Sequence, residues 1–122
     1  MGLANDKSIA WGIVQAVAAQ GAELAFSYQG EALKKRVEPL AASLGKPMLY
    51  ECDVASDDSI DALFTALQVE WGQLDFLVHA IGFADKNELR GRYVDTSRAG
   101  FALAMDISVY SFTAVCQRAA AM

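Results

Sequence analysis

The sequence predicts an α/β fold, a doubly wound parallel sheet with helices on both faces. Short β-favouring runs alternate along the chain with segments whose apolar residues recur at helical spacing. Glycine follows the first three helical segments, at Gly21, Gly45 and Gly72, where it can end a helix. The run LDFLVHA, residues 74–80, is almost continuously apolar, as in a strand covered on both faces. In such sheets, ligands bind at the carboxyl ends of the strands.

The chain opens with MGLANDKSIAWG, a glycine turn that runs directly into a helix. Ser8 is a suitable N-cap for a helix over residues 8–20, whose apolar stripe consists of Ile9, Ile13, Val14 and Val17. A strand over residues 23–28 follows. We interpret MG as the end of a preceding strand, so we expect an incomplete sheet that lacks its first strand.

Two further helix–strand units are predicted from the middle of the chain. One helix lies between Gly30 and Gly45, with Pro39 expected to kink or restart it. Its stripe consists of Leu33, Val37, Leu40 and Leu44. A strand over residues 47–54 leads to a second helix with the stripe Ile60, Leu63, Phe64, Leu67 and Trp71.

The last third of the chain contains a strand over residues 74–80, a polar loop over residues 85–95 and a long helix from Ser97 to the end. The residues expected to face inward on this helix are Phe101, Met105, Phe112, Val115 and Ala119.

Length and composition predict one domain or a piece of one. With the first strand missing, we expect a single partial domain over residues 1–122 and no second domain. A formal net charge of −5 argues against binding to nucleic acid. No signal-peptide pattern is present and no run approaches about 18 uninterrupted apolar residues, so we expect a cytoplasmic protein without a membrane span. Cys52 and Cys116 match no metal or disulfide spacing and are expected to be reduced and buried.

The opening turn has the physical features of a phosphate site. Gly2 permits a tight turn, and the groups around Ser8 and Ile9 lie at a helix N-terminus, whose dipole favours an anion. Gly12 is expected to let this helix pack closely. The spacing is not the generic G-x-G-x-x-G of dinucleotide sites, and an ordinary loop with a serine N-cap is the alternative interpretation.

Later positions could complete a dinucleotide site. Gln29 lies near the position where an acidic residue often binds the adenosine ribose, and its neutral amide does not decide between NADH and NADPH. Asp53 and Val54 could bind adenine through a carboxylate and a backbone amide, or Asp53 could cap the turn to the next helix. Ile81 and Gly82 could let the backbone approach a cofactor closely, although a tight turn also explains Gly82.

His79, the sole histidine, is interpreted as a buried, hydrogen-bonded structural residue, and no metal site is predicted. On the last helix, Ser108 and Tyr110 could point toward the turn at Gly82, but Tyr110 is expected in the core.

Six motifs occur together: SIAWG at residues 8–12, SYQGEALKKRV at 27–37, ECDV at 51–54, LDFLVHAIGF at 74–83, GRYVDTSR at 91–98 and MDISVYSF at 105–112. Together they resemble the bacterial NADH-dependent enoyl-[acyl-carrier-protein] reductases of fatty-acid synthesis, a divergent branch of the short-chain dehydrogenases. The likeness covers essentially the whole chain. It implies a Rossmann-type homotetramer that uses NADH to reduce the double bond of a trans-2-enoyl chain carried on acyl carrier protein.

The resemblance also implies roles for individual residues. It places Gly2, Ser8 and Ile9 at the phosphates and the adjoining ribose. Gln29 would lie near the adenosine ribose, Asp53 and Val54 at the adenine, and Ile81 and Gly82 along the cofactor. Phe83 and Ala84 would border the acyl pocket.

The family's proton-handling pair, a Tyr followed seven positions later by a Lys, has no counterpart in a suitable place. Only Tyr28 and Lys35 have this spacing, and Tyr28 ends a strand instead of lying on a later helix. We therefore assign no catalytic residue and expect the chain to be the front portion of a reductase, inactive by itself. The alternatives are a noncatalytic dinucleotide-binding module and another short-chain dehydrogenase such as a ketoacyl reductase, which would want an Asn within residues 106–108.

Three arginines, Arg90, Arg92 and Arg98, could form a docking surface for the acidic carrier protein. A solvated loop is the alternative interpretation.

Overall fold

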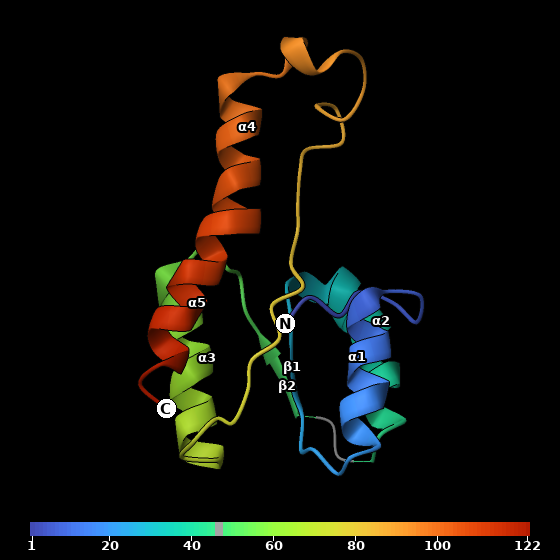
Figure 1. Ribbon diagram of the computed structural model, residues 1–122, viewed down its shortest axis with the longest axis vertical. Coiled ribbons are helices and arrows are strands. Elements are labelled where there is room, and N and C mark those ends of the chain that lie inside the picture. Colours follow the sequence, from blue (N-terminus) through green and yellow to red (C-terminus); the bar gives the residue numbers. More distant parts are fainter. Residues whose placement is uncertain (46–47) are drawn as a thin grey trace.

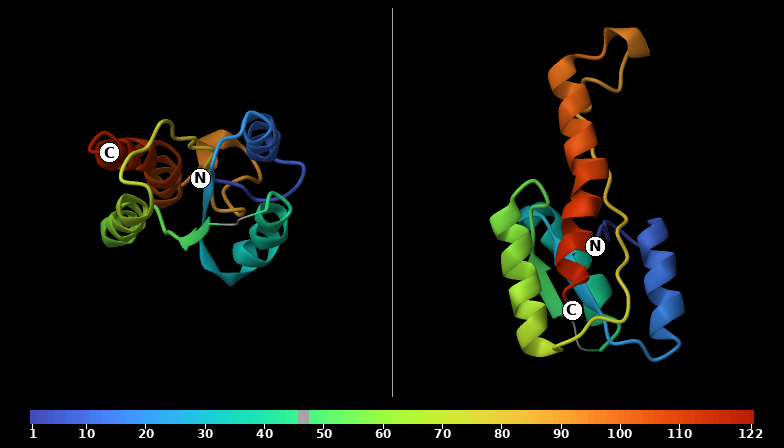
Figure 2. Two further views of the ribbon diagram at one scale, coloured as in Figure 1. Left: turned by 90° about the horizontal axis from the view of Figure 1, so that it is seen from below. Right: turned by 60° about the vertical axis from the view of Figure 1, so that its left-hand side comes forward.

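A parallel pair of strands forms the centre of the molecule, and helices cover both of its faces (Figures 1 and 2). The computed structural model describes residues 1–45 and 48–122. Strand β1 (Ala25–Tyr28) pairs with β2 (Met48–Glu51), with Ala25 opposite Met48 and Tyr28 opposite Glu51. Helices α1 (Ile9–Ala18) and α2 (Gly30–Ala42) lie on one side, and α3 (Asp57–Glu70) and α5 (Ser111–Ala119) on the other. The expected α/β arrangement is confirmed.

The two faces of the sheet enclose separate apolar clusters because side chains alternate along a strand. Phe26 packs with Val37 and Ala41 of α2. Its neighbour Ala25 packs instead against the cluster formed by α3 and α5. The buried residues of α3 are Ile60, Leu63, Phe64 and Leu67, as its stripe predicts.

The helix ends follow the expected cap chemistry. The hydroxyl of Ser8 accepts a hydrogen bond from Trp11 N at 3.2 Å, which confirms it as the N-cap of α1. Pro39 lies inside α2, which continues to Ala42, so the expected restart is wrong. Pro39 is close to the end of the helix and removes an amide donor from its last turns only. Pro47, where the sequence-based strand begins, lies outside the described residues.

The segment of residues 74–80 is not a regular strand, contrary to the sequence-based expectation. It runs beside the core, but Phe76 is about half exposed and only Met1 pairs with its backbone among the described residues. The Met1 amino group donates to Val78 O at 2.7 Å, and Ala80 N donates to Met1 O at 3.1 Å. A strand needs a continuous ladder of such bonds, and Met1 supplies a single rung.

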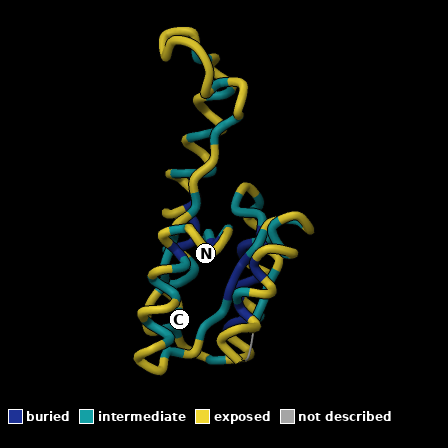
Figure 3. Tube along the Cα trace, turned by 90° about the vertical axis from the view of Figure 1, so that its right-hand side faces the viewer, coloured by how far each residue is buried: buried dark blue, intermediate teal, exposed yellow. Residues whose placement is uncertain are grey.

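Residues 98–119 form one long helical rod that rises from the body (Figure 1). It consists of α4 (Arg98–Met105), a π-helical turn (Asp106–Tyr110) and α5. Val115 is fully buried, as expected, whereas Phe101 is 49% and Phe112 is 53% exposed, and Met105 is also exposed. The inward positions predicted for these three residues are therefore wrong. For Phe101 and Met105 the reason is that α4 contacts no other helix or strand of the described chain beyond the π-helical turn (Figure 3). Phe112 lies on α5, where the buried residues are Ser111, Ala114 and Val115 on another side of the helix.

The rod over Arg98–Ala119 is long enough and apolar enough to cross a membrane. The core helix of a soluble protein meets the same two criteria. The rod is therefore weak evidence for a membrane span.

Candidate functional site

The candidate site lies where the carboxyl ends of the strands meet the opening turn. Gly2 has a φ of +90°, and an added Cβ would lie 2.3 Å from Ala80 O and 2.9 Å from Ile81 N. Any side chain at this position would collide with backbone, so the tight turn requires glycine. The fold thus brings Gly2 next to Ile81, two predicted cofactor residues that are 79 positions apart in the sequence.

The N-terminus of α1 opens at the same edge, a short loop after Gly2 (Figure 1). The Ser8 hydroxyl donates to Asn5 O at 2.7 Å and caps the helix, so the ordinary N-cap of the alternative interpretation is present. The first-turn amides of a helix have no acceptor within the helix and can bind an anion. The side chain of Ile9 is 83% exposed beside them.

The expectation that Gly12 lets α1 pack closely is wrong. A Cβ at Gly12 would meet no described atom within 4 Å. Helix α1 instead packs through Ala10 and Val14, which lie on its inner face.

Gln29 and Asp53 follow the two strands and therefore lie at this edge as well. Gln29 is exposed and occupies the N-cap position of α2 without a side-chain cap bond. Asp53 accepts from Ala55 N at 3.0 Å, so its carboxylate does cap the turn after β2. Val54 packs its side chain against the α3 and α5 cluster, which leaves its backbone as the part that could contact a ligand. The adenosine roles of these residues stay predictions.

Gly82 borders open space. A Cβ there would meet no described atom within 4 Å, and its φ is not in the left-handed region. The tight-turn explanation for Gly82 therefore does not hold, because the backbone conformation does not demand glycine. Phe83 is half exposed and Ala84 is partly buried just beyond it.

His79 is held by the first two residues of α5. Its Nε2 lies 2.8 Å from Ser111 Oγ, and its ring meets Phe112 edge-on at 5.5 Å. These contacts confirm the structural, hydrogen-bonded interpretation, although the side chain is only partly buried.

Ser108 does point toward the segment at Gly82, where its hydroxyl accepts a hydrogen bond from Phe83 N. Tyr110 is 52% exposed, so its expected place in the core is wrong, because nothing in the described chain covers that side of the rod.

Stability is expected to fall as the pH is lowered from 7 to 5.5, because burial lowers the pKa of the His79 imidazole below its usual value. The unfolded chain then binds more protons than the folded chain between the two pKa values, which favours unfolding on acidification. Urea unfolding at several pH values measures this effect. His79→Gln keeps an amide donor near Ser111 and should reduce the slope; an unchanged slope would contradict the assignment to His79.

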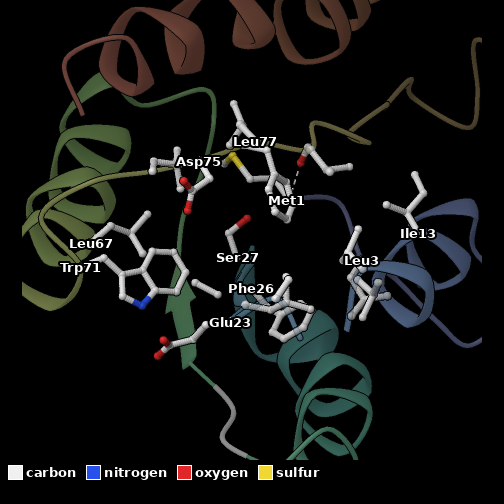
Figure 4. Close-up of a pocket in the computed structure, with 18 of the residues that line it drawn as sticks. Met1, Leu3, Ile13, Glu23, Phe26, Ser27, Leu67, Trp71, Asp75 and Leu77 are labelled. Atoms are coloured by element: carbon white, nitrogen blue, oxygen red, sulfur yellow. Dashed lines mark hydrogen bonds between the residues drawn. The ribbon is translucent and has the colours of Figure 1, made fainter. Parts of the chain in front are cut away.

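A cavity of about 420 Å³ lies elsewhere, between β1, α1 and residues 73–78 (Figure 4). Its walls are mainly apolar and include Leu3, Phe26, Leu67, Trp71 and Leu77, with Met1 at one end. The predicted cofactor residues do not line it, so the cavity is separate from the candidate site.

No cluster of metal-ligating side chains occurs within residues 1–45 and 48–122. Both cysteines are free thiols: Cys52 is buried, as expected, and Cys116 is partly buried. Burial raises the pKa of the Cys52 thiol, which favours its inert, protonated form.

The parallel β1–α2–β2 unit and the helices on both faces of its sheet form an incomplete Rossmann-type α/β fold. The family model for enoyl-(acyl carrier protein) reductase matches residues 2–122. The chain belongs to the enoyl-(acyl carrier protein) reductase family.

Curated relatives and solved structures agree with this assignment. The chain is 63% identical over 119 residues to the enoyl-[acyl-carrier-protein] reductase [NADH] 1 of Rhizobium meliloti (strain 1021), covering 98% of this chain and 44% of the relative. It is 49% identical over 122 residues to the NADH-dependent reductase of Escherichia coli (strain K12), covering 99% and 47%. A crystal structure of the Anaplasma phagocytophilum reductase in complex with NAD matches with a TM-score of 0.90 and 58% identity, covering 97% and 45%. The chain thus spans less than half the length of these relatives.

Proposed function

We propose that this chain forms the NADH-binding front portion of an enoyl-acyl carrier protein reductase. In the complete enzyme, the nicotinamide would deliver a hydride to the β-carbon of a trans-2-enoyl chain on acyl carrier protein. The observation that carries the proposal is the close approach of the Gly2 turn to Ala80 and Ile81. This approach places the N-terminus of α1 and the open space beside Gly82 at the same edge of the sheet. NADH is the cofactor that the relatives' names favour, and NADPH is the alternative.

The residues at this edge fit a dinucleotide. The first turn of α1, with Ser8 and Ile9, would bind the phosphates and the adjoining ribose. Gln29 would contact the adenosine ribose, and Asp53 with Val54 would contact the adenine. Ile81 and Gly82 would run along the cofactor, with Phe83 and Ala84 bordering the acyl chain. The cofactor supplies the hydride, and these residues orient it.

Gly82→Val is expected to weaken NADH binding at least about tenfold while changing the free energy of unfolding by less than about 0.5 kcal/mol. The new side chain enters space that is free of described protein atoms, where the cofactor would lie. Titration of the chain with NADH, followed by nucleotide fluorescence, measures the affinity, and urea unfolding measures stability. Unchanged NADH affinity would remove Gly82 from the proposed site.

We expect no turnover by the 122-residue chain, because it lacks a suitable Tyr and Lys pair to polarise the thioester. Oxidation of NADH by the pure chain with an enoyl thioester would contradict this expectation.

The noncatalytic-module alternative predicts NADH binding without turnover even in the complete protein. A ketoacyl reductase would instead reduce a 3-ketoacyl thioester, but residues 106–108, Asp-Ile-Ser, contain no Asn.

We further propose a homotetramer in the cytoplasm for the complete enzyme. The exposed apolar side chains of the rod, among them Phe101, Met105 and Phe112, support burial against further protein. Light scattering on the complete protein tests the assembly. Flotation with lipid vesicles would detect a membrane role of the rod instead.

The proposed carrier-protein surface rests on Arg90, Arg92 and Arg98, all exposed. Arg92 already donates two hydrogen bonds, of 2.9 and 3.0 Å, to the Asp95 carboxylate. This pairing lowers the net positive charge that the surface presents to a partner. Neutralising Arg90 and Arg98 together should weaken binding of acyl carrier protein at low salt. No change would favour the solvated loop.

A further inference from the structure

A π-helical turn interrupts the long rod where it passes the candidate site. Residues 106–110 form this turn between α4 and α5. Such turns are rare and frequently occur at functional sites, because they change the direction of the side chains around them. Two hydroxyls, those of Ser108 within the turn and Ser111 directly after it, reach the segment 79–83.

Ser108 satisfies both backbone groups of one residue. Its Oγ accepts from Phe83 N at 2.9 Å and donates to Phe83 O at 3.0 Å. A hydroxyl has one proton and can accept bonds as well, so the two contacts are compatible. Ser108 thus takes the place that a neighbouring strand would take beside Phe83.

Ser111 holds the other end of the same segment. It is fully buried, and its Oγ donates its single proton to Ile107 O at 2.6 Å. The bond to His79 must therefore run from the imidazole to the serine, with the proton on Nε2, at 2.8 Å. From these two contacts we assign the proton of the neutral His79 imidazole to Nε2.

We infer that Ser108 and Ser111 are positioning residues that hold Phe83 and His79 and so present the intervening Ile81 and Gly82 to the cofactor. The need for such anchors is visible in the fold. Beyond the single rung at Met1, the described chain offers this segment no strand ladder. Without the two hydroxyls, the backbone between His79 and Phe83 would be fixed only near Ala80, by its hydrogen bond to Met1. That the two serines hold this segment follows from the contacts, and that the segment is held for the cofactor rests on the proposed function.

Amide hydrogen exchange in the ligand-free 122-residue chain tests the anchor at Phe83. Ser108→Ala is expected to speed exchange of the Phe83 amide about tenfold, the loss of roughly one hydrogen bond. Ser108→Thr keeps a hydroxyl and should retain the protection. Thr113→Ala, which removes an exposed hydroxyl from the same rod, should leave Phe83 unchanged. Equal exchange in the parent chain and Ser108→Ala would overturn the role of Ser108, as would loss of protection in Ser108→Thr.

Nitrogen-15 NMR of His79 tests the anchor at Ser111. The parent chain should show the proton on Nε2, and Ser111→Ala should lose this fixed tautomer while Thr113→Ala keeps it. A proton fixed on Nδ1 in the parent chain would overturn the assignment.

An NADH titration then tests the link to the cofactor. Ser108→Ala should weaken NADH binding several-fold, and Ser108→Thr should restore it. Unchanged affinity in Ser108→Ala, together with faster Phe83 exchange, would contradict the link and leave the anchor supported. Absence of NADH binding by the parent chain would count against the proposed function, whereas the exchange and tautomer results would still decide the anchors.

Discussion

Replacing Gly2 with alanine is expected to lower the free energy of unfolding by about 3 kcal/mol or more. The φ of +90° alone is unfavourable for alanine, by about 1–2 kcal/mol. The added Cβ would also lie 2.3 Å from the carbonyl oxygen of Ala80, where only a shift of backbone relieves the collision. The shift would separate the opening turn from Ile81, so we expect NADH binding to fail as well. Urea unfolding and NADH titration measure both effects.

Gly12→Ala is the matched control for this substitution. Gly12 lies inside α1, and a Cβ there meets open space within the described chain. Alanine should stabilise the helix by about 0.5–1 kcal/mol, because it loses less backbone entropy than glycine on folding. If Gly2→Ala and Gly12→Ala had the same effect on stability, the close approach of Gly2 to Ala80 would be refuted.

A chain extended before Met1 by five apolar, β-branched residues is expected to be more stable by at least about 2 kcal/mol, the value of burying a few aliphatic side chains net of ordering them. Strand β1 pairs with β2 on one edge only within the described residues. Beyond its other edge lies the 420 Å³ cavity, bounded on the far side by residues 73–78. The bonds of Met1 to Val78 and Ala80 have the form that the last residue of a parallel strand would make.

A Gly/Ser extension of equal length serves as the control, because it lengthens the chain without apolar side chains to fill the cavity. Thermal unfolding compares the two extended chains with the parent. The apolar extension should also protect the amides of Leu77 and Val78 from hydrogen exchange, which the Gly/Ser extension should not do. Equal stability of the two extended chains would show that the cavity does not accept a strand.

Local sequence patterns were sufficient for the helices and for β1 and β2. Ser8, Ser56 and Ser97 cap helices through contacts with residues three positions away, and the α3 stripe requires only helical periodicity. The segment 74–80 shows the limit of this reasoning. Its composition is that of a buried strand, but a strand forms only where a neighbouring strand pairs with it along its length, and no local pattern contains that information.

The candidate site divides in the same way. Gly2, Ser8, Gln29, Asp53 and Gly82 could be singled out because strand ends and helix starts carry recognisable residues. The sequence predicted that Ser108 could point toward the turn at Gly82, but it did not predict the bonds that Ser108 and Ser111 make. Their partners Phe83 and His79 lie 25 and 32 positions away, beyond the reach of local patterns. The π-helical turn, which contains Ser108 and directly precedes Ser111, was not predicted from the sequence.

The sequence by itself determined the α/β class, because periodicity, caps and glycine turns are local properties of the chain. Its motifs determined the family. The edge at which a cofactor would bind stays a prediction. Only the tertiary structure decided that Gly2 lies against Ala80, that His79 is hydrogen-bonded to Ser111 and that the upper rod is uncovered. These features depend on which distant segments come into contact. The packing of the two apolar clusters on the faces of the sheet decides which segments do so.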